Sequence, residues 1–139
     1  MRRKTLRIGI TGLTFDAAHY TPGVKEECLN LHGHTFRVDV EVEGPLGPDG
    51  MVMDFSALKE AVRRVLEPWD HALVVPEGEA SRIELEGPFK VKLKIIKAPA
   101  ATTEHMALAI AEELHAALGL PVRVRVWEGE GKYAEAEAR

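Results

Sequence analysis

One stretch of the chain has a strict two-residue hydrophobic period, and it restricts the possible folds more than any other feature. Four apolar residues alternate there with four charged ones: Phe36, Val38, Val40 and Val42 with Arg37, Asp39, Glu41 and Glu43. This period is typical of a β-strand with one face on the core and the other in water. We therefore expect a sheet that is covered on one face.

A second strand is predicted upstream, and its hydrophobic pattern changes phase. Leu6, Ile8 and Ile10 share one parity, and Leu13, Phe15 and Ala17 share the other. The change falls at Gly12, as expected for a β-bulge, and the bent strand would end at His19. Further strands are predicted from Val122 and, after a turn at 129–131, over residues 132–138.

Two amphipathic helices are predicted between these strands. The first follows a predicted N-cap at Asp54 and stops at Pro68, and the second begins at Thr102 and is closed by Gly119. The order of elements has no regular βαβ alternation. It favours an α+β fold, with an antiparallel sheet and two helices, in one domain over residues 1–139.

Residues 73–97 are less regular, and we predict a β-hairpin there. Apolar and charged residues alternate on both sides of a turn at Gly87-Pro88, and Lys90, Lys92 and Lys94 share the outer face of the second strand. These lysines are read as solvated residues that protect an exposed sheet edge, with phosphate binding as the alternative.

Composition narrows the function classes. The 139 residues have a formal charge of −4 and a pI near 5.9, which argue against a general affinity for nucleic acid or for an anionic membrane. The one cysteine cannot form an internal disulfide, and no apolar run has the length of a signal peptide or membrane span. We therefore expect a cytoplasmic protein that acts on a small molecule.

Three of the six histidines fall within sixteen residues, at His19, His32 and His34. His32 and His34 have the parity of the apolar strand residues, so both imidazoles would leave one strand on the same side, roughly 7 Å apart. A third imidazole at the end of the neighbouring strand would complete a three-nitrogen site. Three neutral imidazoles with an open fourth position are typical of catalytic Zn²⁺.

Two further positions carry candidate proton-transfer groups. Cys28 lies four residues ahead of His32, where it could be a fourth metal ligand, a small buried residue or a reactive thiol. Asp70 and His71 are either polar residues at a helix end or a carboxylate that holds an imidazole for proton transfer.

Glu128 continues the parity of the valines of the last long strand. If the register holds, its carboxylate faces inward at the strand end, where it would need a pair of donors such as a guanidine-like ligand edge. If Gly129 breaks the register, Glu128 turns to solvent instead.

Together these residues resemble a known family along nearly the whole chain. The motifs are Phe15-Asp-Ala-Ala-His19, Cys28-x-x-x-His32-Gly-His34, Gly50-Met-Val-Met-Asp54-Phe, Asp70-His71, Thr102-Thr-Glu104 and Val126-Trp-Glu128. They resemble the 6-pyruvoyl-tetrahydropterin synthase family. The short gap between the cysteine and His-Gly-His is most similar to its bacterial 6-carboxy-5,6,7,8-tetrahydropterin synthase branch, which serves queuosine and other deazapurine pathways.

The resemblance implies a T-fold, in which subunits form a β-barrel as trimers and two trimers stack as a hexamer with active sites between subunits. The implied substrate is 7,8-dihydroneopterin triphosphate, which the 6-carboxy branch converts to 6-carboxy-5,6,7,8-tetrahydropterin with release of triphosphate and acetaldehyde.

The resemblance also implies a role for each site residue. His19, His32 and His34 would bind one Zn²⁺ per subunit. Cys28 would be the proton-abstracting base, with Asp70 and His71 as the relay. Glu128 would anchor the pterin edge, and Thr102, Thr103 and Glu104 would line the pterin pocket.

Other functions stay open at this point. Glu27 stands beside Cys28, and some relatives use a glutamate near this place to make a folate precursor; a 6-pyruvoyl product is a further alternative. From other classes, the chain would be a non-catalytic pterin or purine binder with a structural metal, or a zinc hydrolase that uses metal-bound hydroxide. Residues 73–97 also make a longer segment than many members of the family have.

Overall fold

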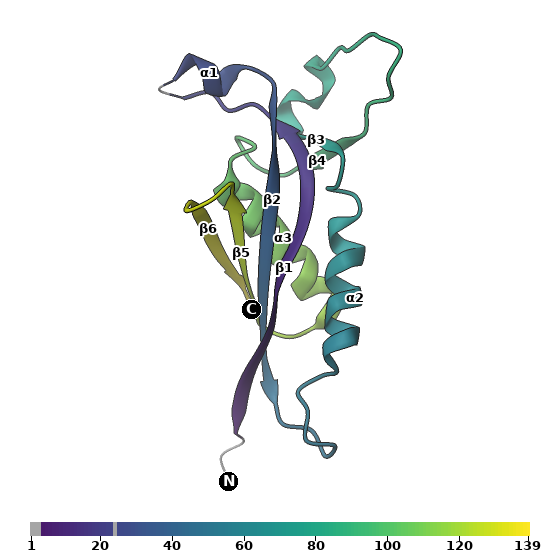
Figure 1. The fold of residues 1–139 in the computed structure, drawn as a ribbon, viewed down its shortest axis with the longest axis vertical. Coiled ribbons are helices and arrows are strands. Elements are labelled where there is room, and N and C mark those ends of the chain that lie inside the picture. The colour runs from purple at the N-terminus through teal and green to yellow at the C-terminus, as the bar shows by residue number, and fades with distance from the viewer. Residues whose placement is uncertain (1–3, 24) are drawn as a thin grey trace.

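The computed structural model describes residues 4–23 and 25–139, and a long pair of strands runs along its length (Figure 1). Strand β1 (Thr5–His19) pairs antiparallel with β2 (His32–Pro45), and the short helix α1 (Glu26–Leu29) lies in the connection between them. The remaining elements are α2 (Phe55–Leu66), β3 (Ala72–Pro76), the 3-10 helix η1 (Glu77–Arg82), β4 (Leu93–Ile96), α3 (Thr103–Leu118), β5 (Val122–Glu128) and β6 (Tyr133–Ala138).

The predicted bulge in β1 is confirmed. Ile10 pairs with Val40 but the next core pair is Leu13 with Val38, so β1 has one residue more than β2 between them. Gly12 takes a φ of 84° there, a conformation that glycine adopts without strain, and its N–H donates to Asp39 Oδ1 at 3.0 Å. The bulge places Leu13, Phe15 and Ala17 on the same sheet face as the core residues of β2.

The six strands form a mixed sheet in the order β4-β3-β1-β2-β5-β6. The four strands β1, β2, β5 and β6 are antiparallel as expected, whereas β3 pairs parallel with β1, and β4 pairs parallel with β3. The prediction of a wholly antiparallel sheet is therefore wrong for these two strands. A parallel pair needs a crossover rather than a tight turn.

The predicted hairpin over 73–97 is wrong for the same reason. After β3 the chain passes through η1 and a loop, which brings β4 back to run in the same direction as β3. Gly87 and Pro88 lie in this loop, and the alternating residues before Leu93 have no partner strand, so side chains such as Phe89 stay exposed.

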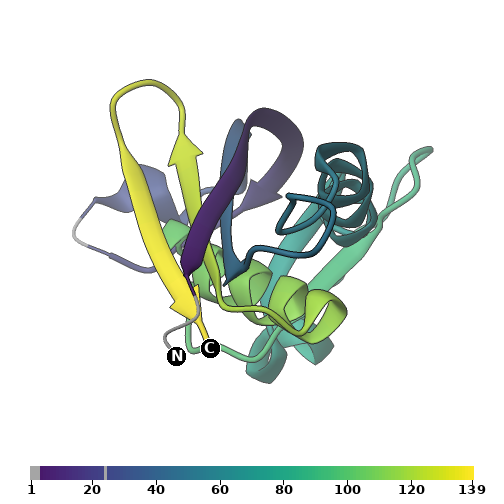
Figure 2. The same ribbon diagram turned by 90° about the horizontal axis from the view of Figure 1, so that it is seen from below.

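Helices α2 and α3 lie on one face of the sheet (Figure 2), where they enclose the core. Asp54 caps α2 by accepting from the N–H groups of Ser56 and Ala57, and α3 ends at Gly119 with a φ of 70°. Stacked Phe15 and Phe36 rings lie in this core, with a ring centroid distance of 5.1 Å. No helix of the described part is long and apolar enough to span a membrane.

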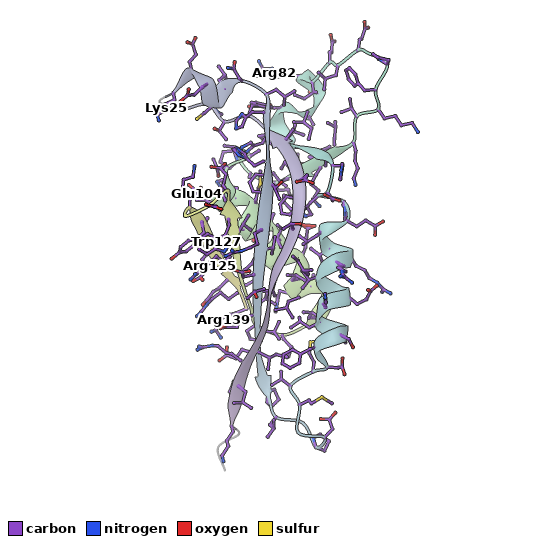
Figure 3. All side chains as sticks on the ribbon, viewed as in Figure 1. Lys25, Arg82, Glu104, Arg125, Trp127 and Arg139 are labelled. Atoms are coloured by element: carbon purple, nitrogen blue, oxygen red, sulfur yellow. The ribbon has the colours of Figure 1, made fainter. Side chains whose placement is uncertain are left out.

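The other face of the sheet is polar. Trp127 packs under the guanidinium of Arg37, 4.3 Å from its ring centroid, and donates from Nε1 to Asp39 Oδ2 at 2.8 Å. Figure 3 shows Trp127 and Arg125 along β5 and β6 on this side. Ion pairs join the strands further down, among them Arg123 with Glu137 at 2.7 Å.

Candidate active site

The three predicted histidines come together where β1 ends and β2 begins. His19 and His32 are direct partners across the two strands, and His34 follows two residues later on the same face. One ligand nitrogen of each residue lies within 4.8 Å of those of the other two, so the group could hold a metal ion. The ring centroids are 4.6 to 5.3 Å apart.

Backbone carbonyls orient two of these rings. Nδ1 of His19 lies 2.8 Å from the Ala101 carbonyl oxygen, and Nδ1 of His32 lies 2.6 Å from that of Asn30. A carbonyl only accepts hydrogen bonds, so each Nδ1 carries the hydrogen and each neutral ring presents the lone pair of Nε2. This is the usual arrangement of metal-binding histidines, in which the second nitrogen donates to an outer partner.

Burial keeps two rings of this cluster uncharged, those of His19 and His34. Burial is the largest cause that lowers the pKa of His19, and it also lowers the pKa of His34, so both rings are neutral at pH 7. His19 is 2% exposed, and its Nε2 is a buried atom without a hydrogen-bond partner among the described residues. A buried nitrogen lone pair of this kind is costly unless a cation meets it, which fits a metal.

Glu128 faces the same point from the end of β5. Its Oε1 lies 3.4 Å from Nε2 of His19 and 3.5 Å from Nε2 of His34, and it accepts from Thr103 Oγ1 at 3.3 Å. The inward direction predicted for Glu128 is therefore found. Because a carboxylate opposite neutral nitrogen lone pairs is repulsive, this arrangement again fits a cation between the groups.

Cys28 lies in α1, close in sequence to the histidines, and is half-buried. Its sulfur is outside the group of ligand atoms within 4.8 Å that the three histidines form. Its backbone stabilises the connection between β1 and β2. The Cys28 carbonyl accepts from the N–H of Thr21 at 2.7 Å, and the Cys28 N–H donates to the Lys25 carbonyl at 3.1 Å. The geometry thus leaves the thiol separate from the candidate metal ligands.

Asp70 and His71 form a hydrogen-bonded pair in the turn after α2. Nδ1 of His71 lies 3.0 Å from Asp70 Oδ2, and Asp70 Oδ1 accepts from the N–H of Asp16 at 2.8 Å. That backbone hydrogen bond is the main cause that lowers the pKa of Asp70, so the carboxylate is ionised at neutral pH. The His71 side chain is 77% exposed.

Within one chain, this pair lies beside β1, where the backbone N–H and carbonyl of Asp16 contact Asp70 and His71. Among the described residues, no hydrogen bond or ion pair joins it to the histidine cluster. An open depression of about 550 Å³ is lined by residues 16–18, 33–35, 71–73 and 90–92, so His34 and His71 both border it.

The three residues predicted to line a pterin pocket have different surroundings. Thr102 caps α3, because its hydroxyl accepts from the N–H of His105 at 3.2 Å, and Thr103 contacts Glu128. Glu104 is exposed in the first turn of α3 (Figure 3). Only Thr103 of the three therefore reaches the histidine cluster, through Glu128.

Sequence reasoning missed several groups that shape the site. The carbonyl acceptors of Ala101 and Asn30 leave no signal in a sequence, because every residue has a carbonyl. Tyr20, next to His19, donates to Glu79 Oε1 at 2.5 Å, and burial followed by this bond raises the pKa of Tyr20 to about 12. The partner lies in η1, a 3-10 helix that the sequence does not predict within residues 73–97.

The chain is similar in sequence to several known proteins. A protein of Archaeoglobus fulgidus is 41% identical over 129 residues, which are 92% of each chain. The 6-carboxy-5,6,7,8-tetrahydropterin synthase of Haemophilus influenzae is 35% identical over 88% of this chain and 92% of its own. The dihydroneopterin monophosphate aldolase of Pyrococcus furiosus is 38% identical over 84% of each.

The fold has solved counterparts as well. A structure of the Plasmodium vivax 6-pyruvoyltetrahydropterin synthase, a catalytic-residue mutant, superposes with a TM-score of 0.79 at 24% identity, covering 98% of this chain and 99% of that one. This likeness confirms the T-fold. The family profile of 6-pyruvoyl tetrahydropterin synthase matches residues 10–139. The chain is therefore a member of the 6-pyruvoyl tetrahydropterin synthase family, whose named relatives are lyase-type enzymes.

Proposed function

We propose that this protein is a zinc-dependent lyase that converts 7,8-dihydroneopterin triphosphate and water to 6-carboxy-5,6,7,8-tetrahydropterin, with release of triphosphate and acetaldehyde. The observation that carries the proposal is the convergence of His19, His32, His34 and Glu128 on one point. The Haemophilus relative, whose name states this product, supports the choice of reaction. We place the reaction in the cytoplasm, in queuosine and deazapurine biosynthesis.

Each residue of the chain has a defined task in this proposal. His19, His32 and His34 would hold Zn²⁺, which supplies a Lewis acid for the oxygens of the substrate side chain. Cys28 would remove a proton from that side chain, since its sulfur lies apart from the ligand set. Glu128, with its carboxylate at the cluster, would accept hydrogen bonds from the amino-pyrimidinone edge of the pterin.

Asp70 and His71 would move the proton onward. The Asp70 carboxylate holds Nδ1 of His71, which leaves Nε2 directed to the exposed side for exchange. Because no hydrogen bond or ion pair joins this pair to the histidine cluster among the described residues, one copy of the chain does not connect these groups. We infer that a second copy supplies its pair to the first cluster, in a hexamer built as a dimer of trimers.

The test is a product assay with the purified, zinc-loaded protein and 7,8-dihydroneopterin triphosphate, with His34→Ala as the control. We expect mass spectrometry to detect the carboxy-pterin together with acetaldehyde in the parent only. Formation of a pyruvoyl-pterin would instead assign the protein to the 6-pyruvoyl branch of the family. Absence of any pterin product from zinc-loaded protein would contradict the proposal and favour a binding protein with a structural metal.

A second candidate function is an aldolase reaction that gives a folate precursor. The Pyrococcus furiosus relative, named a dihydroneopterin monophosphate aldolase, favours it, and Glu27 stands beside Cys28 as a second possible base. The two functions predict opposite results for two variants. Cys28→Ala abolishes turnover and Glu27→Gln preserves it in a carboxy-pterin synthase, whereas the reverse pattern would assign the base to Glu27.

A further inference from the structure

The peptide group that joins Asp70 to His71 is fixed at both ends. On one side, the His71 N–H donates to the Asp16 carbonyl at 2.6 Å. On the other, the Asp70 carbonyl accepts from the Lys92 ammonium at 2.8 Å. The same ammonium donates to the Glu67 carbonyl at 2.8 Å, at the end of α2. One lysine thus connects the end of this helix to the peptide that precedes His71.

This peptide group needs to be held, because His71 has an unfavourable backbone conformation. Its φ is 60°, and it is the one non-glycine residue with a positive φ in the part of the chain that the structure describes. Side chains with a Cβ rarely adopt this region, and they stay there only when surrounding contacts fix them. The angle φ of His71 sets how its ring is directed relative to the peptide group that Lys92 holds.

Lys92 is itself well placed to act as a fixed support. Its carbonyl accepts from the N–H of Leu73 at 2.8 Å, so its backbone is bound to the start of β3 directly after the Asp70 and His71 turn. A cation at the carbonyl end of a helix is also favourable, because the last carbonyls lack partners within the helix. Lys92 is exposed, but its ammonium makes two specific hydrogen bonds to carbonyls that a lysine protecting a sheet edge does not need.

We propose that Lys92 is a positioning residue for His71. By holding the Asp70 carbonyl, it keeps the His71 ring in the direction that proton transfer requires, and it acts on the reaction only through His71. The inference rests on the proposed function, in which Asp70 and His71 form the proton relay. A purely structural role, in which Lys92 only closes the end of α2 through Glu67, is the alternative that the test has to separate.

The kinetic test uses Lys92→Met, with Lys59→Met on the exposed side of α2 as the matched control. We expect Lys92→Met to lower kcat by about 10-fold or more with KM changed less than about 2-fold, since misplacing a catalytic group costs rate rather than substrate binding. Lys92→Arg, which keeps a cationic donor, should restore most of kcat. An unchanged kcat in Lys92→Met would overturn the proposal.

Combination with His71→Ala separates positioning from a structural role. If Lys92 acts through His71, Lys92→Met should lower the residual kcat of His71→Ala by less than about 2-fold, because the group that it positions is gone. A loss of the same size in both backgrounds would overturn the proposal in favour of general destabilisation.

A measurement without substrate tests the positioning role of Lys92 separately from the proposed function. In spectra of the protein with isotope-labelled histidine, the ring signals of His71, assigned with His71→Ala, should shift in Lys92→Met and stay in place in Lys59→Met. Unmoved His71 signals would overturn the positioning role. If the parent makes no pterin product, the proposed function fails, while these spectra still decide whether Lys92 sets the His71 ring.

Discussion

Nε2 of His19 is the atom of this site whose surroundings most require a cation. It is buried, it carries a lone pair because Nδ1 donates to Ala101, and a carboxylate oxygen of Glu128 lies 3.4 Å away. Such an atom is costly in a folded protein without a cation. We therefore expect a metal ion to stabilise the histidine cluster in this form, so that metal binding is coupled to folding.

Removing one histidine should remove the metal. We expect His34→Ala, dialysed after loading with zinc, to retain less than about a tenth of the zinc of the parent, because two imidazoles cannot complete the three-ligand site. His105→Ala, whose ring lies outside the cluster, should retain the parent's content. Metal analysis by mass spectrometry measures both. Equal zinc in His34→Ala and the parent would place the metal elsewhere.

The metal-free protein should lose stability as the pH falls below neutrality. Burial lowers the folded-state pKa of His19 and His34 below the ordinary value of 6.5, so the unfolded chain takes up protons first. The neutral rings cost no stability above that value, and stability is lost as the pH falls below it. Asp70, whose pKa is lowered from 3.8, contributes stability at neutral pH that is lost only in more acidic solution.

Urea unfolding in the presence of a chelator measures this effect. We expect a lower midpoint at about pH 5.5 than at about pH 7.5, and a smaller difference in His19→Phe, which lacks the buried titrating ring. A midpoint that rises on acidification would show that the rings are protonated in the folded state.

At the scale of single residues, the sequence predicts the chemistry of each site residue better than it predicts which groups surround that residue. The spacing of His19, His32 and His34 and the parity of Glu128 were sufficient to predict the cluster, because strand periodicity fixes which side chains share a face. The acceptors Ala101 and Asn30, and the contact of Lys92 with the Asp70 carbonyl, depend on loops whose paths leave no periodic signal.

At the scale of elements, local signals predicted the helices and most strands. Caps at Asp54 and Thr102, the stop at Gly119 and the bulge at Gly12 each have a residue type that the local backbone requires. The direction of β4 had no such signal, because the alternation of apolar residues is the same in parallel and antiparallel strands. The hairpin over 73–97 was predicted from a turn motif that lies in a loop instead.

The cap of α3 provides a test of this local reasoning. Thr102→Ala should lower the free energy of unfolding by about 1 kcal/mol, because the N–H of His105 loses its acceptor. Thr102→Ser keeps a hydroxyl and should stay close to the parent in urea unfolding. If both variants keep the parent's stability but raise KM for the pterin, the residue serves the substrate rather than the helix.

At the scale of the whole molecule, the arrangement of faces and edges governs function. The helices cover one sheet face, the polar face is open, and β4 and β6 are the outer strands of the sheet. The histidine cluster lies where β1 ends and β2 begins, and Asp70 and His71 lie beside β1 at the start of β3. In the proposed assembly, a complete site would combine the cluster of one copy with the pair of another.

Mixing two impaired variants tests this arrangement. His34→Ala lacks the metal cluster and should be inactive, whereas His71→Ala lacks the relay and should keep only a small residual activity. Co-expressed in equal amounts, they should recover about a quarter of the parent's activity, because random assembly joins two intact halves at that frequency. Activity no higher than that of the separate variants would show that one subunit supplies both the histidine cluster and the Asp70 and His71 relay.

The two tryptophans lie in very different surroundings. Trp69 is fully buried beside Phe15, whereas Trp127 lies half-exposed on the polar face, stacked with Arg37 and directly before Glu128. A small polar quencher should therefore dim the emission of Trp127 and spare that of Trp69. The chain thus carries its own optical probe one residue before Glu128, and a change in its emission on addition of a pterin would report binding at this end of β5 without any label.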